Sequence, residues 1–358
     1  MSMARILIVD DSPVVREFLK DWLAAEKDLK VVGEAKDGRE AFEMTKSLSP
    51  NLVIMDVMMP NMNGLEATEQ IMAYCPTPVL IFSSVANDRE MNIVFEAISR
   101  GALDVLAKPD KSEDSVKQVR QELIKKVKFL SKVPVIHHPM ARLRARKKVA
   151  GQAAADAKAG LLPEGQFAIL GIGASTGGPQ ALSLLLSQFP KDFPRPIVVV
   201  QHIADAFVEG LAKWLTGLTG LAVKVAAENE ELRPGKVYIA PSDYHMLVKN
   251  NHVELSSSEP VNNCRPAVDI LFHSLAQNYG PGAYAVLLTG MGADGAKGMK
   301  AIREKGGRTV AQDQESSIIF GMPASAIELG GVDEVVALDK IPGKIFSAFG
   351  IPNQGGRK

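Results

Sequence analysis

A serine, a histidine and an aspartate, which together can form a nucleophilic site, follow separate apolar runs in the second half of the chain. Ser175 lies in Gly173-Ala-Ser-Thr-Gly177, which fits the G-x-S-x-G pattern of a serine exposed on a sharp strand-to-helix turn. His202 follows the next apolar run, and Asp294 lies in a glycine-rich segment after another. A serine needs a base, and the base needs an orienting group, so we expect the three side chains to meet at one sheet edge. The spacing predicts nucleophilic catalysis by a serine.

The glycines around this serine allow a second interpretation, dinucleotide binding. Gly171, Gly173 and Gly177 give G-x-G-x-x-x-G, and a helix N-terminus after such a turn can hold a pyrophosphate. The spacing departs from the usual fingerprint, however. The next predicted strand also ends in Gln201-His202, where a cofactor-binding domain would need an acid for the ribose. We therefore favour the serine.

Carboxylates, a hydroxyl and an ammonium group end the apolar runs of the first half. Asp10 and Asp11 follow the first run, and Asp56 follows the third. Clustered carboxylates favour a hard cation such as Mg²⁺. Ser83 and Lys108 end two later runs, and these groups can hydrogen-bond and neutralise the oxygens of an acyl phosphate. The pattern predicts a phosphoryl-accepting site with a bound metal ion.

The elements that position these residues alternate in type along both halves. Short apolar runs occur at 5–10, 31–35, 51–56, 79–83 and 104–108, and again at 168–172, 197–201, 236–239, 284–288 and 309–311. Segments of helical period separate several of them. We therefore predict an α/β protein with two doubly wound parallel-sheet domains, each with its site at the carboxyl ends of the strands.

A basic segment separates the two halves. Residues 131–165 hold seven Lys or Arg against two acids and show little apolar periodicity. We expect a flexible basic linker here, between a domain at 1–130 and a domain at 166–358; a docking site for an acidic partner stays open.

Composition excludes several classes of protein. Lys plus Arg and Asp plus Glu both number 41, so nothing indicates a nucleic-acid partner. Two cysteines, Cys75 and Cys264, cannot make a disulfide framework. No export signal and no apolar run of about 20 residues is present, so we expect a cytoplasmic protein without direct membrane insertion.

The first half resembles the receiver domain of two-component response regulators in four stretches: ILIVDDS, VIMDVMMPNMNG, VLIFSS and AKP. The resemblance implies a five-stranded, flavodoxin-like domain in which Asp56 accepts a phosphoryl group from a histidine kinase. Asp11, Asp56 and the Met58 carbonyl would bind Mg²⁺, with Asp10 assisting through water.

The same resemblance assigns two further residues. Ser83 and Lys108 would sense the phosphoryl group, and the Lys108–Pro109 peptide bond would be cis. Val105 occupies a position that is often aromatic in receivers. We therefore do not expect an aromatic rotamer switch.

The second half resembles the chemotaxis protein-glutamate methylesterases of the CheB family. The matching stretches are GIGASTGGP, VVVQHI, GKVYIAPSDYHM, NCRPAVDILF, LLTGMGADGAKG and AQDQESSIIFGMP. The resemblance implies a Rossmann-like methylesterase domain without a cofactor. Ser175 would be the nucleophile, His202 the general base and Asp294 its orienting carboxylate, and the Met291 backbone N–H would donate to the oxyanion.

Two other residues in these stretches have less defined roles. We expect His245 to give structural support, although a role near the substrate stays open. Arg265 could contact a substrate or an interface, or could form a structural salt bridge.

Together the two resemblances imply phosphorylation-activated hydrolysis of glutamate 5-methyl esters on methyl-accepting chemoreceptors, with deamidation of receptor glutamines, giving sensory adaptation. The implied partners are the histidine kinase of the chemotaxis system and the receptors. Two alternatives stay open: an esterase of this family in a non-swimming chemosensory pathway, and a response regulator with a binding output. A DNA-binding output would predict a small, basic, helical domain, whereas residues 167–358 are glycine-rich and α/β in pattern.

Overall fold

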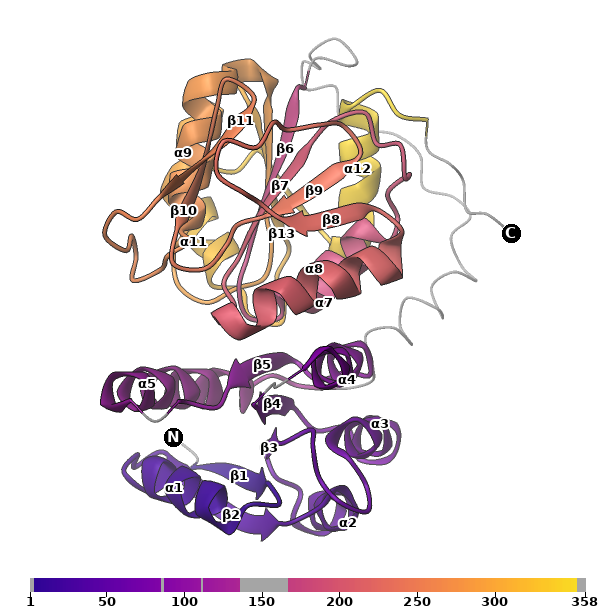
Figure 1. Cartoon of the computed structure of the whole chain (residues 1–358), viewed down its shortest axis with the longest axis vertical. Coiled ribbons are helices and arrows are strands. Elements are labelled where there is room, and N and C mark those ends of the chain that lie inside the picture. Colours follow the sequence, from indigo (N-terminus) through magenta and orange to yellow (C-terminus); the bar gives the residue numbers. More distant parts are fainter. Residues whose placement is uncertain (1–2, 85–86, 111, 136–166, 353–358) are drawn as a thin grey trace. The chain divides into compact units, whose positions relative to one another are not determined.

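The computed structural model describes residues 3–84, 87–110, 112–135 and 167–352. Contacts divide the chain into two compact units (Figure 1). Most of the predicted linker lies outside the described residues. Within the described ranges, no helix is long and apolar enough to cross a membrane.

The first unit is a five-stranded parallel sheet with the order β2-β1-β3-β4-β5, as a flavodoxin-like fold requires. Figure 1 shows α1 and α5 on one face and α2, α3 and α4 on the other. The strands are β1 Ala4–Val9, β2 Leu29–Ala35, β3 Leu52–Met55, β4 Val79–Ser83 and β5 Asp104–Ala107. The helices are α1 Pro13–Ala24, α2 Gly38–Leu48, α3 Gly64–Tyr74, α4 Asp88–Ser99 and α5 Glu113–Leu130. All five predicted strands are confirmed.

The second unit is a seven-stranded parallel sheet with the order β14-β13-β12-β6-β7-β9-β8, flanked by helices, with a separate antiparallel hairpin. The sheet strands are β6 Ile169–Ala174, β7 Ile197–Gln201, β8 Ala222–Val225, β9 Lys236–Ile239, β12 Ala283–Leu287, β13 Arg308–Gln312 and β14 Glu334–Val336. The hairpin pairs β10 His245–Lys249 with β11 His252–Ser256. The helices are α7 Gly178–Leu186, α8 Asp205–Thr219, α9 Val268–Tyr279, α10 Ala296–Glu304, α11 Met322–Glu328 and α12 Ile341–Ala348.

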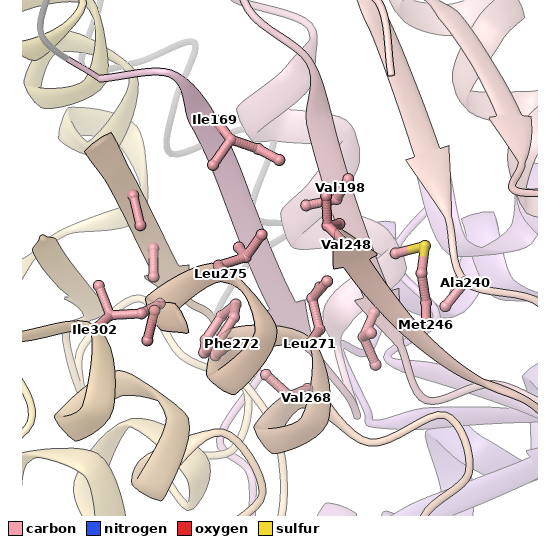
Figure 2. Packing of buried hydrophobic residues seen from close by; sticks show 14 of the residues in the cluster. Ile169, Val198, Ala240, Met246, Val248, Val268, Leu271, Phe272, Leu275 and Ile302 are labelled. Carbon is pink, nitrogen blue, oxygen red and sulfur yellow. The ribbon is translucent and has the colours of Figure 1, made fainter. Parts of the chain in front are cut away.

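The core of the second unit explains the glycines that suggested dinucleotide binding. Figure 2 shows α9 packed on the sheet through Val268, Leu271, Phe272 and Leu275. A Cβ at residue 171 would lie 2.5 Å from Leu275 Cδ1, and one at 173 would lie 2.4 Å from Val268 Cγ1. The two strand glycines therefore allow α9 to pack closely on β6, and their pattern needs no nucleotide to explain it.

Both sheets have a topological switch point next to their first strand. The chain adds β2 on one side of β1 and then β3 on the other, and it adds β7 and later β12 on opposite sides of β6. Ligands of doubly wound sheets bind at such points, outside the carboxyl ends of the strands. The predicted site residues of each unit follow these strand ends.

Candidate active site and acidic cluster

A tight turn after β6 positions Ser175. Gly177 has φ 77°, a left-handed conformation that suits glycine, and α7 begins at the next residue. The Ser175 N–H donates to the Thr289 carbonyl (3.1 Å), and the Gly178 N–H donates to the Ser175 carbonyl (2.7 Å). A Cβ at residue 290 would lie 2.8 Å from Ser175 Cβ. The turn is therefore packed against the glycine-rich loop after β12, and only 9% of Ser175 is exposed.

His202 lies directly after β7, beside this turn. Its N–H donates to the Ala174 carbonyl (3.0 Å). Its ring Nε2 lies 2.9 Å from Asp294 Oδ2, and Nδ1 lies 3.9 Å from Cys264 Sγ. The histidine and aspartate of the predicted triad are therefore in direct contact.

The N-terminus of α9 holds the Asp294 carboxylate. Val268 N–H donates to Oδ2 (2.7 Å), while Asp269 N–H and Gly295 N–H each donate to Oδ1 (3.1 Å). Burial raises the pKa of Asp294, but the contact with His202 and the hydrogen bonds from Val268 N–H and the Asn262 side chain outweigh burial and lower it. Asp294 is therefore a fixed anion facing the imidazole.

This anion controls the charge of His202. Burial lowers the pKa of His202, but the hydrogen bond to Asp294, with a contribution from Cys264, raises it to about 9. At neutral pH the ring is therefore mostly protonated in this conformation. It must lose that proton before it can act as a base.

The contact between Ser175 and His202 is the part of the triad that the structure does not show. The Ser175 hydroxyl makes no hydrogen bond to any residue that the structure describes. Since Asp294 occupies Nε2, the ring atom available to the serine is Nδ1. Serine–base hydrogen bonds are often long in unliganded enzymes and tighten with substrate, so the role of Ser175 as nucleophile stays a prediction.

Two backbone N–H groups near Ser175 in the chain or in the adjoining loop are candidate donors to an oxyanion. The Met291 and Thr176 N–H groups donate to no acceptor among the described residues. Gly290 carbonyl holds the loop by accepting from Gly321 N–H (3.0 Å) and Met322 N–H (2.9 Å). The Met291 role stays a prediction. Thr176 was missed from sequence, although the residue after the nucleophile of a G-x-S-x-G turn is a usual donor.

Three other residues of the site had no predicted role. Asn262 Nδ2 donates to Asp269 Oδ2 and to Asp294 Oδ1, both at 2.9 Å, so it joins two buried carboxylates. Cys264 lies beside the imidazole, and the Gln201 side chain donates to the Ser175 carbonyl. No periodic signal marks Asn262 or Cys264, because both lie in an irregular segment.

His245 supports this segment, as expected. The side chain is fully buried; Nδ1 accepts from Ala267 N–H (3.1 Å) and Nε2 donates to the Glu259 carbonyl (3.1 Å). His245 therefore holds the segment in place at Glu259 and at Ala267. Arg265 instead donates to the carbonyls of Ser257 and Ser258, and it has no carboxylate partner among the described residues.

The acidic cluster of the first unit surrounds Asp56. Ser83 Oγ donates to Asp56 Oδ1 (2.6 Å), and Lys108 Nζ donates to Asp56 Oδ2 (2.9 Å). Lys108 Nζ also lies 2.7 Å from Asp10 Oδ2. Burial lowers the pKa of Lys108, but Asp56 and Asp10 outweigh burial and raise it, so the ammonium stays charged.

The same cluster has the donor set of a hard-cation site. Carboxylate oxygens of Asp10, Asp11 and Asp56 lie within 4.8 Å of one another. Burial, and secondarily Asp56, raise the pKa of Asp10, while Lys108 lowers it, and the net shift is upward. A divalent cation would relieve this repulsion, so the residues fit Mg²⁺. Met58 lies in the loop after β3, and the role of its carbonyl stays a prediction.

One expectation about this site is wrong. Among the described residues the only cis peptide bond is Arg265–Pro266, so Lys108–Pro109 is trans. X–Pro bonds favour trans unless their surroundings impose cis. Lys108 reaches both carboxylates with the trans bond.

The fold and the two sites define a two-domain α/β protein that combines a receiver-type acidic cluster with a His–Asp pair beside a turn that carries a serine. The response regulator receiver domain model matches residues 6–120, and the CheB methylesterase model matches residues 170–345. The chain belongs to the CheB methylesterase family and carries a receiver domain.

Relatives match along nearly the whole chain. The protein-glutamate methylesterase/protein-glutamine glutaminase of Nitrosospira multiformis is 42% identical over 342 residues, 95% of each chain. That of Thermotoga maritima is 41% identical over 351 residues, 96% of this chain and 97% of its own. The crystal structure of the Thermotoga maritima CheB methylesterase catalytic domain is 45% identical, with a TM-score of 0.48, and covers 50% of this chain and 97% of its own.

Proposed function

We propose that this chain hydrolyses glutamate 5-methyl esters on methyl-accepting chemoreceptors, and deamidates receptor glutamines, in the cytoplasm. The names of the relatives support both reactions. The main structural support is the 2.9 Å contact between His202 and Asp294 beside the turn that carries Ser175. A purely binding output is disfavoured, because the second unit belongs to a methylesterase family.

Acylation begins when neutral His202 accepts the Ser175 proton at Nδ1. The Ser175 oxygen then attacks the ester carbonyl carbon, and negative charge develops on the carbonyl oxygen. The N–H groups of Met291 and Thr176 would stabilise this oxyanion. Asp294 stabilises the imidazolium that forms, which then protonates the departing methoxide.

Deacylation repeats these steps with water as the nucleophile. His202 removes a proton from water, and the hydroxide attacks the acyl-enzyme. The imidazolium then returns this proton to the departing Ser175 oxygen, which leaves a glutamate side chain on the receptor. A glutamine side chain passes through the corresponding tetrahedral intermediate, loses ammonia in place of methanol, and gives the same acyl-enzyme. One site therefore serves both reactions.

The receiver would control this activity. A histidine kinase of the chemotaxis system would phosphorylate Asp56, and Ser83 and Lys108 would transfer their hydrogen bonds to the phosphoryl oxygens. Asp11, Asp56 and the Met58 carbonyl would hold Mg²⁺, with Asp10 assisting. Bound Mg²⁺ supplies charge neutralisation for phosphoryl transfer.

The test is product release from purified methylated receptor, with and without a small-molecule phosphodonor. We expect methanol from methylated receptor, ammonia from receptor carrying glutamine, and new glutamate side chains by mass spectrometry. Absence of both products, with and without phosphodonor, would refute the proposal. A swimming assay of a deletion strain distinguishes swimming chemotaxis from another chemosensory output.

A further inference from the structure

Gln201 contacts the backbones of both proposed reacting residues, Ser175 and His202, and the sequence predicted no catalytic role for it. It is the last residue of β7, pairs with Ala174 of β6, and is 2% exposed. Its side-chain Nε2 donates to the Ser175 carbonyl (2.9 Å) and to the His202 carbonyl (2.9 Å). One planar amide therefore uses both of its hydrogens on the backbones of the nucleophile and the base.

The space around the Gln201 side chain accommodates its amide group. A Cβ at residue 178 would lie 1.9 Å from Gln201 Oε1, so the glycine leaves the space that the amide occupies. Oε1 is buried and accepts no hydrogen bond from the residues that the structure describes. An apolar side chain of similar size would avoid that cost, so packing alone does not explain a glutamine here.

We propose that Gln201 is a positioning residue that fixes the separation of Ser175 and His202 for proton transfer. This inference rests on the proposed function. The Ser175 hydroxyl has no side-chain anchor of its own among the described residues, so its distance from Nδ1 depends on how the two backbones are held. Gln201 holds both. Removing its donors leaves the triad residues present but lets their spacing vary.

The expected effect is on the rate of acylation. Misplacement of a reacting group by about 1 Å can cost on the order of 100-fold in rate. For Gln201→Met, which keeps the volume but has no donors, we expect kcat to fall about 10- to 100-fold with KM within about twofold. Gln201→Glu has no donor when ionised and only one when protonated, so it cannot hold both carbonyls and should also lower kcat.

A fluorophosphonate probe measures Ser175 reactivity without a receptor. In this reaction the Ser175 Oγ–P bond forms, the P–F bond breaks, the proton passes to His202, and fluoride leaves. The full chain with Mg²⁺ and a phosphodonor is labelled, and peptide mass spectrometry locates the adduct. We expect the labelling rate constant to fall with kcat in both variants.

Two further variants separate positioning from stability. Thr309→Val removes a buried hydroxyl that bonds Asp333 (3.0 Å) at the opposite, amino end of β13, so it should lower the melting temperature without changing the labelling rate. Gly178→Ala leaves Gln201 intact but displaces its amide, so it should reproduce the loss. The double variant Gly178→Ala/Gln201→Met should lose no more than the worse single variant.

The outcomes distinguish a failure of the positioning role of Gln201 from a failure of the assignment of Ser175 as nucleophile. Slow labelling in Gln201→Met and Gly178→Ala, with a wild-type rate in Thr309→Val, supports positioning. Wild-type labelling in either Gln201→Met or Gly178→Ala overturns positioning and leaves the proposed function intact. An adduct that forms elsewhere than Ser175 in the wild-type chain overturns the serine assignment itself and the role of Gln201 with it.

Discussion

At the scale of single residues, the orientation of one imidazole determines the chemistry. His202 presents Nε2 to a carboxylate that the α9 N-terminus holds in place, which leaves Nδ1 for proton transfer. Hydrogen bonds to a charged form favour that form. Asp294 therefore orients the ring and also raises the pH at which the ring becomes a base.

This raised pKa predicts the pH dependence of catalysis. Because the pKa of His202 is raised from 6.5 to about 9, the basic form grows tenfold per pH unit below that value. We expect kcat/KM for methyl ester hydrolysis to rise with pH and to level off near pH 9. The protonated ring stabilises the folded state fully below pH 6.5, and this contribution is lost as pH rises through about 9.

Asp294→Asn provides the control. Loss of the carboxylate should lower the pKa of His202, so the profile should level off at lower pH, and kcat should fall by about 10³- to 10⁴-fold, as expected for a lost triad carboxylate. NMR titration of the His202 ring gives the pKa directly. A wild-type profile that is flat between pH 7 and 9 would contradict the assignment of this ring as the base.

At the scale of elements, the sequence predicted those sheet strands that consist of an apolar run, together with the site residues that follow them. Strands buried on both faces read as continuous apolar runs, so β6 and β7 were visible. The unpredicted β8 and β14 are short edge strands with exposed residues, and the hairpin strands β10 and β11 have polar ends. Asn262 and Cys264 were not predicted, because they lie in an irregular segment. Side-chain contacts, such as those of His245, determine the position of that segment, and they leave no periodic pattern in the sequence.

The close packing of α9 on β6 predicts that an added methyl group there is harmful. In Gly173→Ala the new Cβ would lie 2.4 Å from Val268 Cγ1, and Val268 N–H holds Asp294. We expect the free energy of unfolding to fall by about 1–3 kcal/mol, as in other overpacked cores, and esterase activity to fall as well. Chemical denaturation and methanol release measure the two effects.

Gly217 provides the matched control on α8. Nothing lies within 4 Å of a Cβ built at this position. Gly217→Ala should therefore leave activity unchanged and stabilise the protein by about 0.5–1 kcal/mol through helix propensity. If Gly173→Ala and Gly217→Ala changed the free energy of unfolding by the same amount, α9 would tolerate displacement from β6.

At the scale of the whole molecule, the acidic cluster around Asp56 and the predicted esterase site around Ser175 lie in separate compact units of one chain. Allosteric coupling typically amounts to about 1–3 kcal/mol, which corresponds to roughly a 5- to 150-fold change. We expect stimulation of methanol release within this range when a phosphodonor and Mg²⁺ are added to the wild-type chain.

Asp56→Asn should reduce this stimulation to about one-fold, because an amide cannot form the acyl phosphate. The ratio of rates with and without phosphodonor is the measurement. Stimulation that persists in Asp56→Asn would place the phosphorylation elsewhere.

The central claim is that the alcohol of Ser175 attacks the ester. The most direct measurement compares methanol release from methylated receptor by the wild-type chain and by Ser175→Ala, both shown to be folded by circular dichroism. We predict a loss of at least about 10³-fold, as expected when a serine nucleophile is removed. Methanol release by Ser175→Ala within a few-fold of the wild-type rate would contradict it.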